Sequence, residues 1–220
     1  PDGTMTLEYL VSQYDGAIRY FDDQFAKILE SLKSRGIYDN TVIVFVSDHG
    51  EEFMEHGALD HGWTLYQEQL SVPFIMKPAG NEKIQWNLHG RVPEIIDIYP
   101  TVVAAAGLVC AESNLAGRNL LVEGEPEHAF AEADKKNSMA SLTGEGFKYI
   151  RQTKAKKAQL FNLEQDPSEQ NDLRNGSLDA KWDESVFQRV SESKERSLKP
   201  EIATVREAEL ERLRSMGYVN

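Results

Sequence analysis

Cysteine is nearly missing from this chain, which contains one among 220 residues, at Cys110. A single cysteine excludes an intrachain disulfide framework and leaves the redox compartment open. No apolar run approaches the length of a membrane-spanning helix, and no segment has the pattern of a secretory signal. The chain begins with Pro1 instead of methionine, so we expect a processed or excised piece of a longer protein.

Positive charge is also scarce, since 24 Lys and Arg residues face 36 Asp and Glu residues and the net charge is −12. This balance argues against binding to nucleic acid or to anionic membranes, both of which need a basic face. A small anionic substrate is still compatible, because a bound cation can reverse the charge locally. The hydrophobic content of 40% is typical of an ordinary globular protein, with enough apolar residues for one sizeable core.

The richest segment for function runs from Thr41 to His61. Its first six residues, Thr41 to Val46, form a β-branched apolar run that is typical of a buried parallel strand. The run ends in Ser47-Asp48-His49-Gly50, and ligands of open α/β sheets bind beyond the carboxyl ends of such strands. Three of the five histidines lie in this segment. The pattern predicts a site for a metal or an anionic substrate.

The first half of the chain reads as alternating helices and strands. A helix is expected from Thr6 to Gly36, where apolar residues recur at spacings of three and four. A second strand is expected from Val72 to Met76, after the histidine-rich loop. Pro93 to Ala106 predicts another helix, which becomes regular near Tyr99 because a proline follows.

After Gly117 short segments separated by turn residues predict a small antiparallel meander. Its expected strands are His128 to Ala133, Met139 to Thr143, Phe147 to Gln152 and Gln159 to Asn162. Asp166 to Glu169 predicts a turn and a possible helix start, and the polar remainder is expected to be mostly helical, most regularly from Val205 to Met216. We therefore expect an α/β unit over residues 1–122 and a small antiparallel-sheet subdomain with a polar helical tail over residues 123–220.

Taken in order, these segments resemble the C-terminal half of proteins in the sulfatase branch of the alkaline phosphatase superfamily. The resemblance is carried by TVIVFVSDHGEEF, HGWTLYQEQLSVPFIMKPAG, VPEIIDIYPTVVAAAGL, LAGRNLL and LFNLEQDPSEQNDL. It implies part of an alkaline-phosphatase-like mixed sheet with flanking helices, followed by a small α+β subdomain. For the intact protein it implies hydrolysis of sulfate esters, of small molecules or glycans, by a formylglycine nucleophile and a divalent metal.

The resemblance also assigns roles to four residues. Asp48 and His49 match the family's second pair of metal-site residues; calcium is the first expectation, with manganese or zinc as alternatives because an imidazole suits calcium less well. His61 matches a position where some relatives have a lysine at the substrate, so it is predicted to bind sulfate oxygens or protonate the leaving oxygen. The alternative for His61 is packing on Trp63. His56 is expected to line the pocket or to be solvated.

The nucleophile is absent from the sequence. The family's pattern is C/S-x-P/A-x-R, whereas Cys110 stands in Cys110-Ala111-Glu112-Ser113-Asn114. The early aspartate pair that completes the metal site is also absent. We therefore expect the formylglycine in a missing N-terminal part, no activity from this chain alone, and self-association through an exposed sheet edge.

Two rival functions stay open. A phosphodiester or phosphonate hydrolase, or a phosphoglycerol transferase, of the same superfamily is compatible with Asp48-His49. A noncatalytic binding or assembly module is the second alternative.

Glu51 and Glu52 are predicted to form a solvated acidic turn in preference to orienting His49. The resemblance would place the protein in the periplasm or outside the cell, but the sequence identifies neither the compartment nor the alcohol part of the substrate.

Overall fold

The computed structural model describes residues 6–80, 83–88, 90–109, 115–124, 127–133, 138–177, 179–196 and 211. It opens with a long helix, α1 (Leu7–Ser34), as the apolar spacing predicted. The helix begins after Thr6, whose side chain accepts a hydrogen bond of 3.2 Å from the backbone of Tyr9. It ends two residues before Gly36, which has a φ of 68°, a left-handed conformation that favours glycine.

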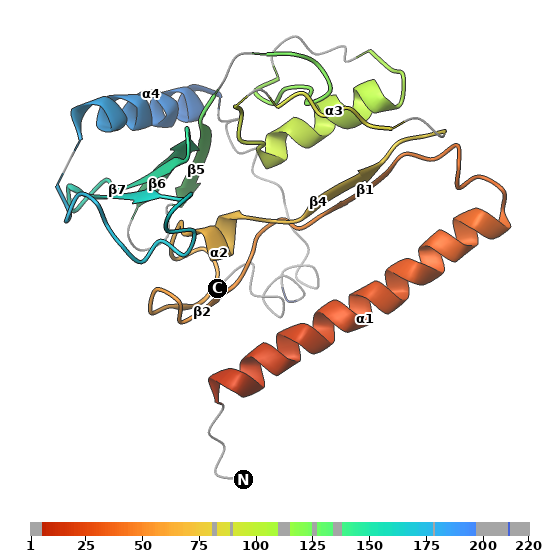
Figure 1. Cartoon of the computed structure of the whole chain (residues 1–220), viewed down its shortest axis with the longest axis horizontal. Helices are drawn as coiled ribbons and strands as arrows, with labels where there is room; N and C mark the ends of the chain where they lie inside the picture. The colour runs from red at the N-terminus through yellow and green to blue at the C-terminus, as the bar shows by residue number, and fades with distance from the viewer. Residues whose placement is uncertain are drawn as a thin grey trace.

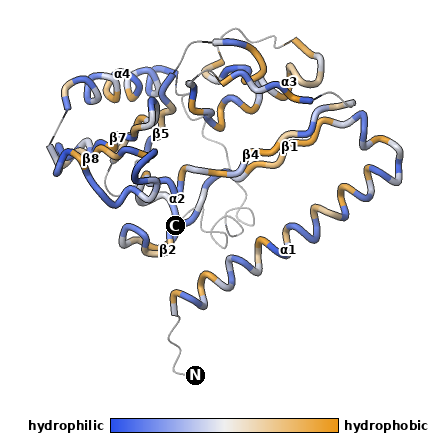
Figure 2. Tube along the Cα trace, viewed as in Figure 1, coloured by the Kyte–Doolittle hydropathy of each residue, from blue (hydrophilic) through white to orange (hydrophobic). Residues whose placement is uncertain are grey.

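Helix α1 lies along one side of the molecule (Figure 1). Hydrophobic and hydrophilic residues alternate along it (Figure 2). Phe21 and Phe25 place their rings 5.7 and 5.8 Å from the ring of Phe45, yet none of the helix residues is buried. The apolar stripe is therefore covered by the described residues only in part.

The next strand, β1 (Ile43–Val46), pairs antiparallel with β4 (Phe74–Lys77), so that Ile43 faces Lys77 and Val46 faces Phe74. The expected parallel pairing is wrong for this pair, and Val46 is exposed. Composition misled the prediction because an apolar run reports how buried a strand can be, not the direction of its neighbour. The two-stranded ribbon is continuous with the loop that carries the candidate site (Figure 1).

Between β1 and β4 the chain forms a small hairpin and one turn of helix. Strand β2 (Glu52–Phe53) pairs antiparallel with β3 (Leu59–Asp60), and α2 (Gln67–Leu70) follows. Gly50, just before the hairpin, lies so close to α2 that a Cβ atom there would stand 1.9 Å from the backbone oxygen of Glu68. Only glycine allows this approach, which seats the hairpin against α2.

The predicted helix after Pro93 is confirmed, with a 3-10 turn, η1 (Ile95–Asp97), leading into α3 (Ile98–Ala105). Asp97 and Thr101 are buried and hold the segment that follows α3. An oxygen of Asp97 accepts from the backbone of Arg118 at 2.7 Å, and the Thr101 hydroxyl accepts from the backbone of Leu120 at 3.0 Å. These bonds join two segments about twenty residues apart.

The predicted antiparallel meander is confirmed as a four-stranded sheet in the order β5-β6-β7-β8. Its strands are β5 (Ala129–Ala133), β6 (Met139–Gly144), β7 (Phe147–Gln152) and β8 (Lys157–Asn162). Helix α4 (Ala180–Arg196) covers one face, where Val186 and Val190 pack with Tyr149 (Figure 1). A second cluster, which includes Leu65 and Phe161, joins the sheet to the α2 region.

Two predictions for the C-terminal part have different outcomes. Asp166 to Glu169 lies in a turn and starts no helix, because the Asp166 carboxylate accepts from the backbone amides of Gln170 and Asn171 and closes a loop. Apart from residue 211, the expected helix from Val205 to Met216 lies outside the described residues. The division of the chain between residues 122 and 123 stays a prediction. Among the described helices, none is long and apolar enough to cross a membrane.

Candidate functional site

Asp48 and His49 follow directly on the end of β1, where the sequence placed them. The Asp48 carboxylate accepts from the His49 backbone at 3.0 Å, and the His49 Nδ1 lies 2.8 Å from the carbonyl oxygen of Gly50. A carbonyl oxygen only accepts, so Nδ1 carries the proton, which in the neutral ring leaves Nε2 with a lone pair. That Nε2 lies 3.8 Å from Asp48 Oδ2, and both side chains are accessible to solvent.

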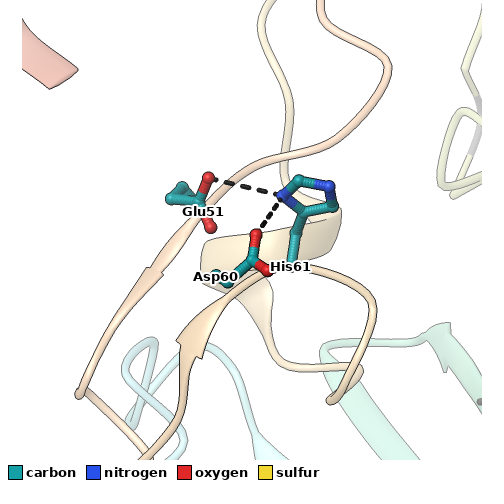
Figure 3. Close-up of side chains that lie close together, drawn as sticks. All are labelled: Glu51, Asp60 and His61. Carbon is teal, nitrogen blue, oxygen red and sulfur yellow. Dashed lines mark hydrogen bonds and ion pairs between the residues drawn. The ribbon is translucent and has the colours of Figure 1, made fainter. Parts of the chain in front are cut away.

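His61, at the end of the β2–β3 hairpin, stacks on His49 with 3.8 Å between the ring centroids. Its Nδ1 lies 2.9 Å from Asp60 Oδ1 and 3.4 Å from Glu51 Oε2 (Figure 3). The structure thus brings the predicted metal-site pair and the predicted substrate residue together, although they are twelve positions apart in the sequence. Glu51 and Asp60 join them there, and neither was among the expected site residues.

His56 occupies a different environment from the other two histidines. Its ring stacks on Tyr66 with 3.6 Å between centroids, Nδ1 lies 2.6 Å from Glu68 Oε1, and Nε2 lies 3.0 Å from the backbone oxygen of Glu169. Burial alone would lower the pKa of His56, but these two acceptors outweigh it and the pKa is raised above 6.5. Two acceptors on two ring nitrogens suit an imidazolium, so this side chain is held in place and is not solvated.

Glu52 is the residue whose environment in the structure differs most from the sequence prediction. Far from being solvated, it is fully buried at the start of β2. One carboxylate oxygen accepts from the Thr64 hydroxyl at 2.6 Å and from the Gln69 amide at 2.9 Å, while the other accepts from the Ala58 backbone at 2.9 Å. Burial raises the pKa of Glu52, but these donors reverse the effect, and the pKa is lowered below 4.5.

Glu52 therefore holds the hairpin that presents Asp60 and His61. No local signal distinguishes it from Glu51, because its donors lie 4 to 17 positions further along the chain. Its burial follows from the β2–β3 pairing, which turns one acidic residue of the pair inward and leaves its neighbour facing His61.

Behind the hairpin, a second buried carboxylate ties it to the C-terminal sheet. Glu169 and Lys148 are both fully buried, and Lys148 Nζ lies 3.0 Å from Glu169 Oε1. The other oxygen of Glu169 accepts from the backbone of Gln67 at 2.6 Å. Burial raises the pKa of Glu169 and lowers that of Lys148, and the opposite charge of the partner counteracts each shift.

Comparison with known proteins identifies the family of this chain. Residues 2–108 match the sulfatase family model, a range that contains β1, the β2–β3 hairpin and His49, His56 and His61. The chain belongs to the sulfatase family. An endo-4-O-sulfatase of Bacteroides thetaiotaomicron is 36% identical over 110 residues, which are 50% of this chain and 21% of that protein. An arylsulfatase of Clostridium perfringens is 29% identical over 181 residues, which are 77% of this chain and 37% of that protein.

Solved sulfatase structures support the fold. One, described in complex with its substrate D-glucosamine-2-N,6-O-disulfate, superposes with a TM-score of 0.63 at 23% identity, covering 79% of this chain and 38% of that one. The likeness is to an alkaline-phosphatase-like α/β fold, to which this chain contributes helices and small antiparallel sheets. The sulfatase chain thus spans between about a fifth and two fifths of the length of these relatives.

Proposed function

We propose that this chain supplies the Asp48, His49 and His61 part of the active site of a metal-dependent sulfatase. The observation that supports the proposal is the stacking of His61 on His49, because it places the His61 imidazole beside the Asp48 carboxylate and Nε2 of His49. Family membership supplies the reaction class, hydrolysis of a sulfate ester. The names of the relatives point to a sulfated glycan as the substrate.

Asp48 and His49 fit a divalent cation. The carboxylate offers oxygen ligands, and the bond from His49 Nδ1 to Gly50 fixes the ring so that Nε2 can coordinate. When bound, such an ion would neutralise charge that develops on the sulfuryl group. Calcium is the first candidate, with manganese or zinc favoured by the imidazole.

His61 would act on the substrate itself. As an imidazolium it would hold the sulfate oxygens, and it would deliver a proton to the leaving oxygen as the ester bond breaks. Asp60 and Glu51 lie 2.9 and 3.4 Å from its Nδ1, where they orient the ring. The nucleophile is expected to be a formylglycine, supplied by a segment with the C/S-x-P/A-x-R pattern that this sequence does not contain.

Two measurements on the 220-residue chain test this proposal. Calorimetric titration with calcium, manganese and zinc is expected to give saturable binding, which Asp48→Asn weakens about tenfold or more while the matched control Asp22→Asn leaves it unchanged. The metal-loaded chain is then expected to bind a sulfated disaccharide better than its desulfated form, with the preference lost in His61→Ala and kept in His61→Lys.

Several results would contradict the proposal. Equal binding of sulfated and desulfated sugar would show that sulfate esters are not the substrates. A preference for an aryl phosphodiester would favour the phosphoryl-transfer alternative. Failure to bind any of the three metals favours a noncatalytic module. Robust turnover of an aryl sulfate by this chain alone would show that it needs no further nucleophile.

We also propose that the isolated chain self-associates. Strand β1 has one paired edge among the described residues, Ile75 of β4 is 64% exposed, and α1 buries none of its apolar residues. Unpaired strand edges and apolar faces of this kind favour pairing with another chain. Light scattering at rising concentration is expected to show dimers or larger species, fewer in Ile75→Lys than in the exposed helix control Gln13→Lys. A concentration-independent monomer would refute the proposal.

A further inference from the structure

Glu51, Asp60 and His61 form a cluster of three potential metal ligands beside the pair already assigned to the sulfatase site. One ligand atom from each residue lies within 4.8 Å of the others. Figure 3 shows both carboxylates directed at the same ring nitrogen of His61, Nδ1. The three residues come from two segments of chain, one entering β2 and one leaving β3, which the hairpin brings together.

The two distances from His61 Nδ1 to the carboxylates match the spacing of neighbouring ligands around a small cation. Transition metals bind nitrogen and oxygen at about 2.0–2.2 Å, so adjacent ligands at tetrahedral or octahedral angles lie roughly 2.8–3.6 Å apart. The two distances from His61 Nδ1 are 2.9 Å to Asp60 and 3.4 Å to Glu51. An ion can therefore replace the Nδ1 proton with little movement of the side chains.

A separate observation concerns the second oxygen of Glu51. Its Oε1 is buried and has no hydrogen-bond partner among the described residues, although the carboxylate as a whole is 20% exposed. A buried carboxylate oxygen without a donor is unfavourable, and a cation held by the same carboxylate would relieve that cost.

We propose that Glu51, Asp60 and His61 bind one zinc ion. One imidazole nitrogen and two carboxylate oxygens suit zinc better than calcium, which prefers oxygen ligands only. Three protein ligands also leave a coordination position for water, as in open zinc sites. This site shares no ligand with the Asp48 and His49 pair, and it follows from the hairpin geometry whether or not the sulfate-ester proposal holds.

The zinc site would compete with the role proposed for His61. An imidazole whose Nδ1 holds a metal cannot also carry a proton there, so the ring loses the charge with which it would hold sulfate oxygens. Zinc at this site would thus exclude the imidazolium form of His61, and the charge at this place would be that of the metal. The hairpin would make the protein sensitive to zinc at a place separate from its expected catalytic metal.

Nitrogen NMR of the 220-residue chain, labelled with ¹⁵N-histidine and titrated with zinc chloride, tests the proposal. The Nδ1 signal of His61 is expected to move with saturation at one equivalent, also in Asp48→Asn, which disables the other metal site. Glu51→Gln and Asp60→Asn are each expected to weaken this response about tenfold or more, while the exposed control Asp22→Asn does not. Circular dichroism confirms that each variant is folded.

Three outcomes would overturn the zinc site. The His61 Nδ1 signal does not move, or it moves equally in the Glu51 and Asp60 variants, or the response vanishes in Asp48→Asn. The last result would place the zinc at the Asp48 and His49 pair, which supports the sulfatase assignment while it removes this inference. Conversely, a His61 response in a chain that ignores sulfated sugar would retain the zinc site and contradict the proposed function.

Discussion

Replacing Lys148 with methionine is expected to lower the free energy of unfolding by about 3–5 kcal/mol, because it strands a buried carboxylate. Glu169 is fully buried and keeps only the 2.6 Å bond from the Gln67 backbone when the ammonium is gone. Glu169→Gln is expected to be similarly destabilising, since it leaves a buried ammonium. Urea denaturation followed by circular dichroism measures both losses.

The double variant Lys148→Met/Glu169→Gln separates the contribution of the ion pair to the free energy of unfolding from the contribution of the packing around it. Because neither charge is then left alone, most of the lost stability is expected to return, and the double variant should be more stable than either single one.

The stability lost in Lys148→Met should also become smaller at acid pH. The raised pKa of Glu169 means that the folded state takes up its proton first, so the stranded charge disappears as the pH falls. Additive single effects with no pH dependence would contradict this account.

Glu52→Ala is expected to cost about 3–5 kcal/mol and to loosen the hairpin before the rest of the chain unfolds. The substitution removes the acceptor used by the Thr64 hydroxyl, the Gln69 amide and the Ala58 backbone. Each buried donor left without a partner costs about 1–3 kcal/mol, and the Gln69 amide keeps its existing bond of 2.6 Å to the Thr64 hydroxyl.

Hydrogen exchange distinguishes local loosening from global destabilisation in this variant. The Ala58 amide should exchange much faster in Glu52→Ala, whereas amides of β6 and β7 should keep the protection set by global stability. Glu52→Gln retains one accepting oxygen, so its Ala58 amide should exchange at a rate between those of the unchanged chain and of Glu52→Ala. Asp22→Asn, an exposed acidic position on α1, serves as the control. Unchanged exchange at Ala58 would show that the carboxylate does not hold the hairpin.

Local patterns predicted most of the elements of this fold. The three- and four-residue spacing gave α1, the glycines marked where α1 and α3 end, and the turn residues divided the meander into its four strands. These features depend on residues within a few positions of one another. The direction of the strand beside β1 was missed, since it depends on how 27 intervening residues fold back.

The candidate site divides in the same way. Asp48, His49 and His61 were predicted because the strand that ends at Val46 and the family resemblance both point to them, and their roles stay predictions. Glu51 and Glu52 look alike in the sequence, yet one faces His61 and the other is buried under Thr64 and Gln69. Only the hairpin pairing and the close approach at Gly50 separate them, and both are tertiary.

The buried bonds of Glu169 also fix an order of events during synthesis. Its backbone oxygen meets His56 across 113 positions, and its carboxylate meets Gln67 across 102. The hairpin with His61 leaves the ribosome more than a hundred residues before Glu169, and these supports do not exist until Glu169 has followed. Contacts of such long range form slowly, so the nascent hairpin stays exposed to solvent until the four-stranded sheet and Glu169 pack against it.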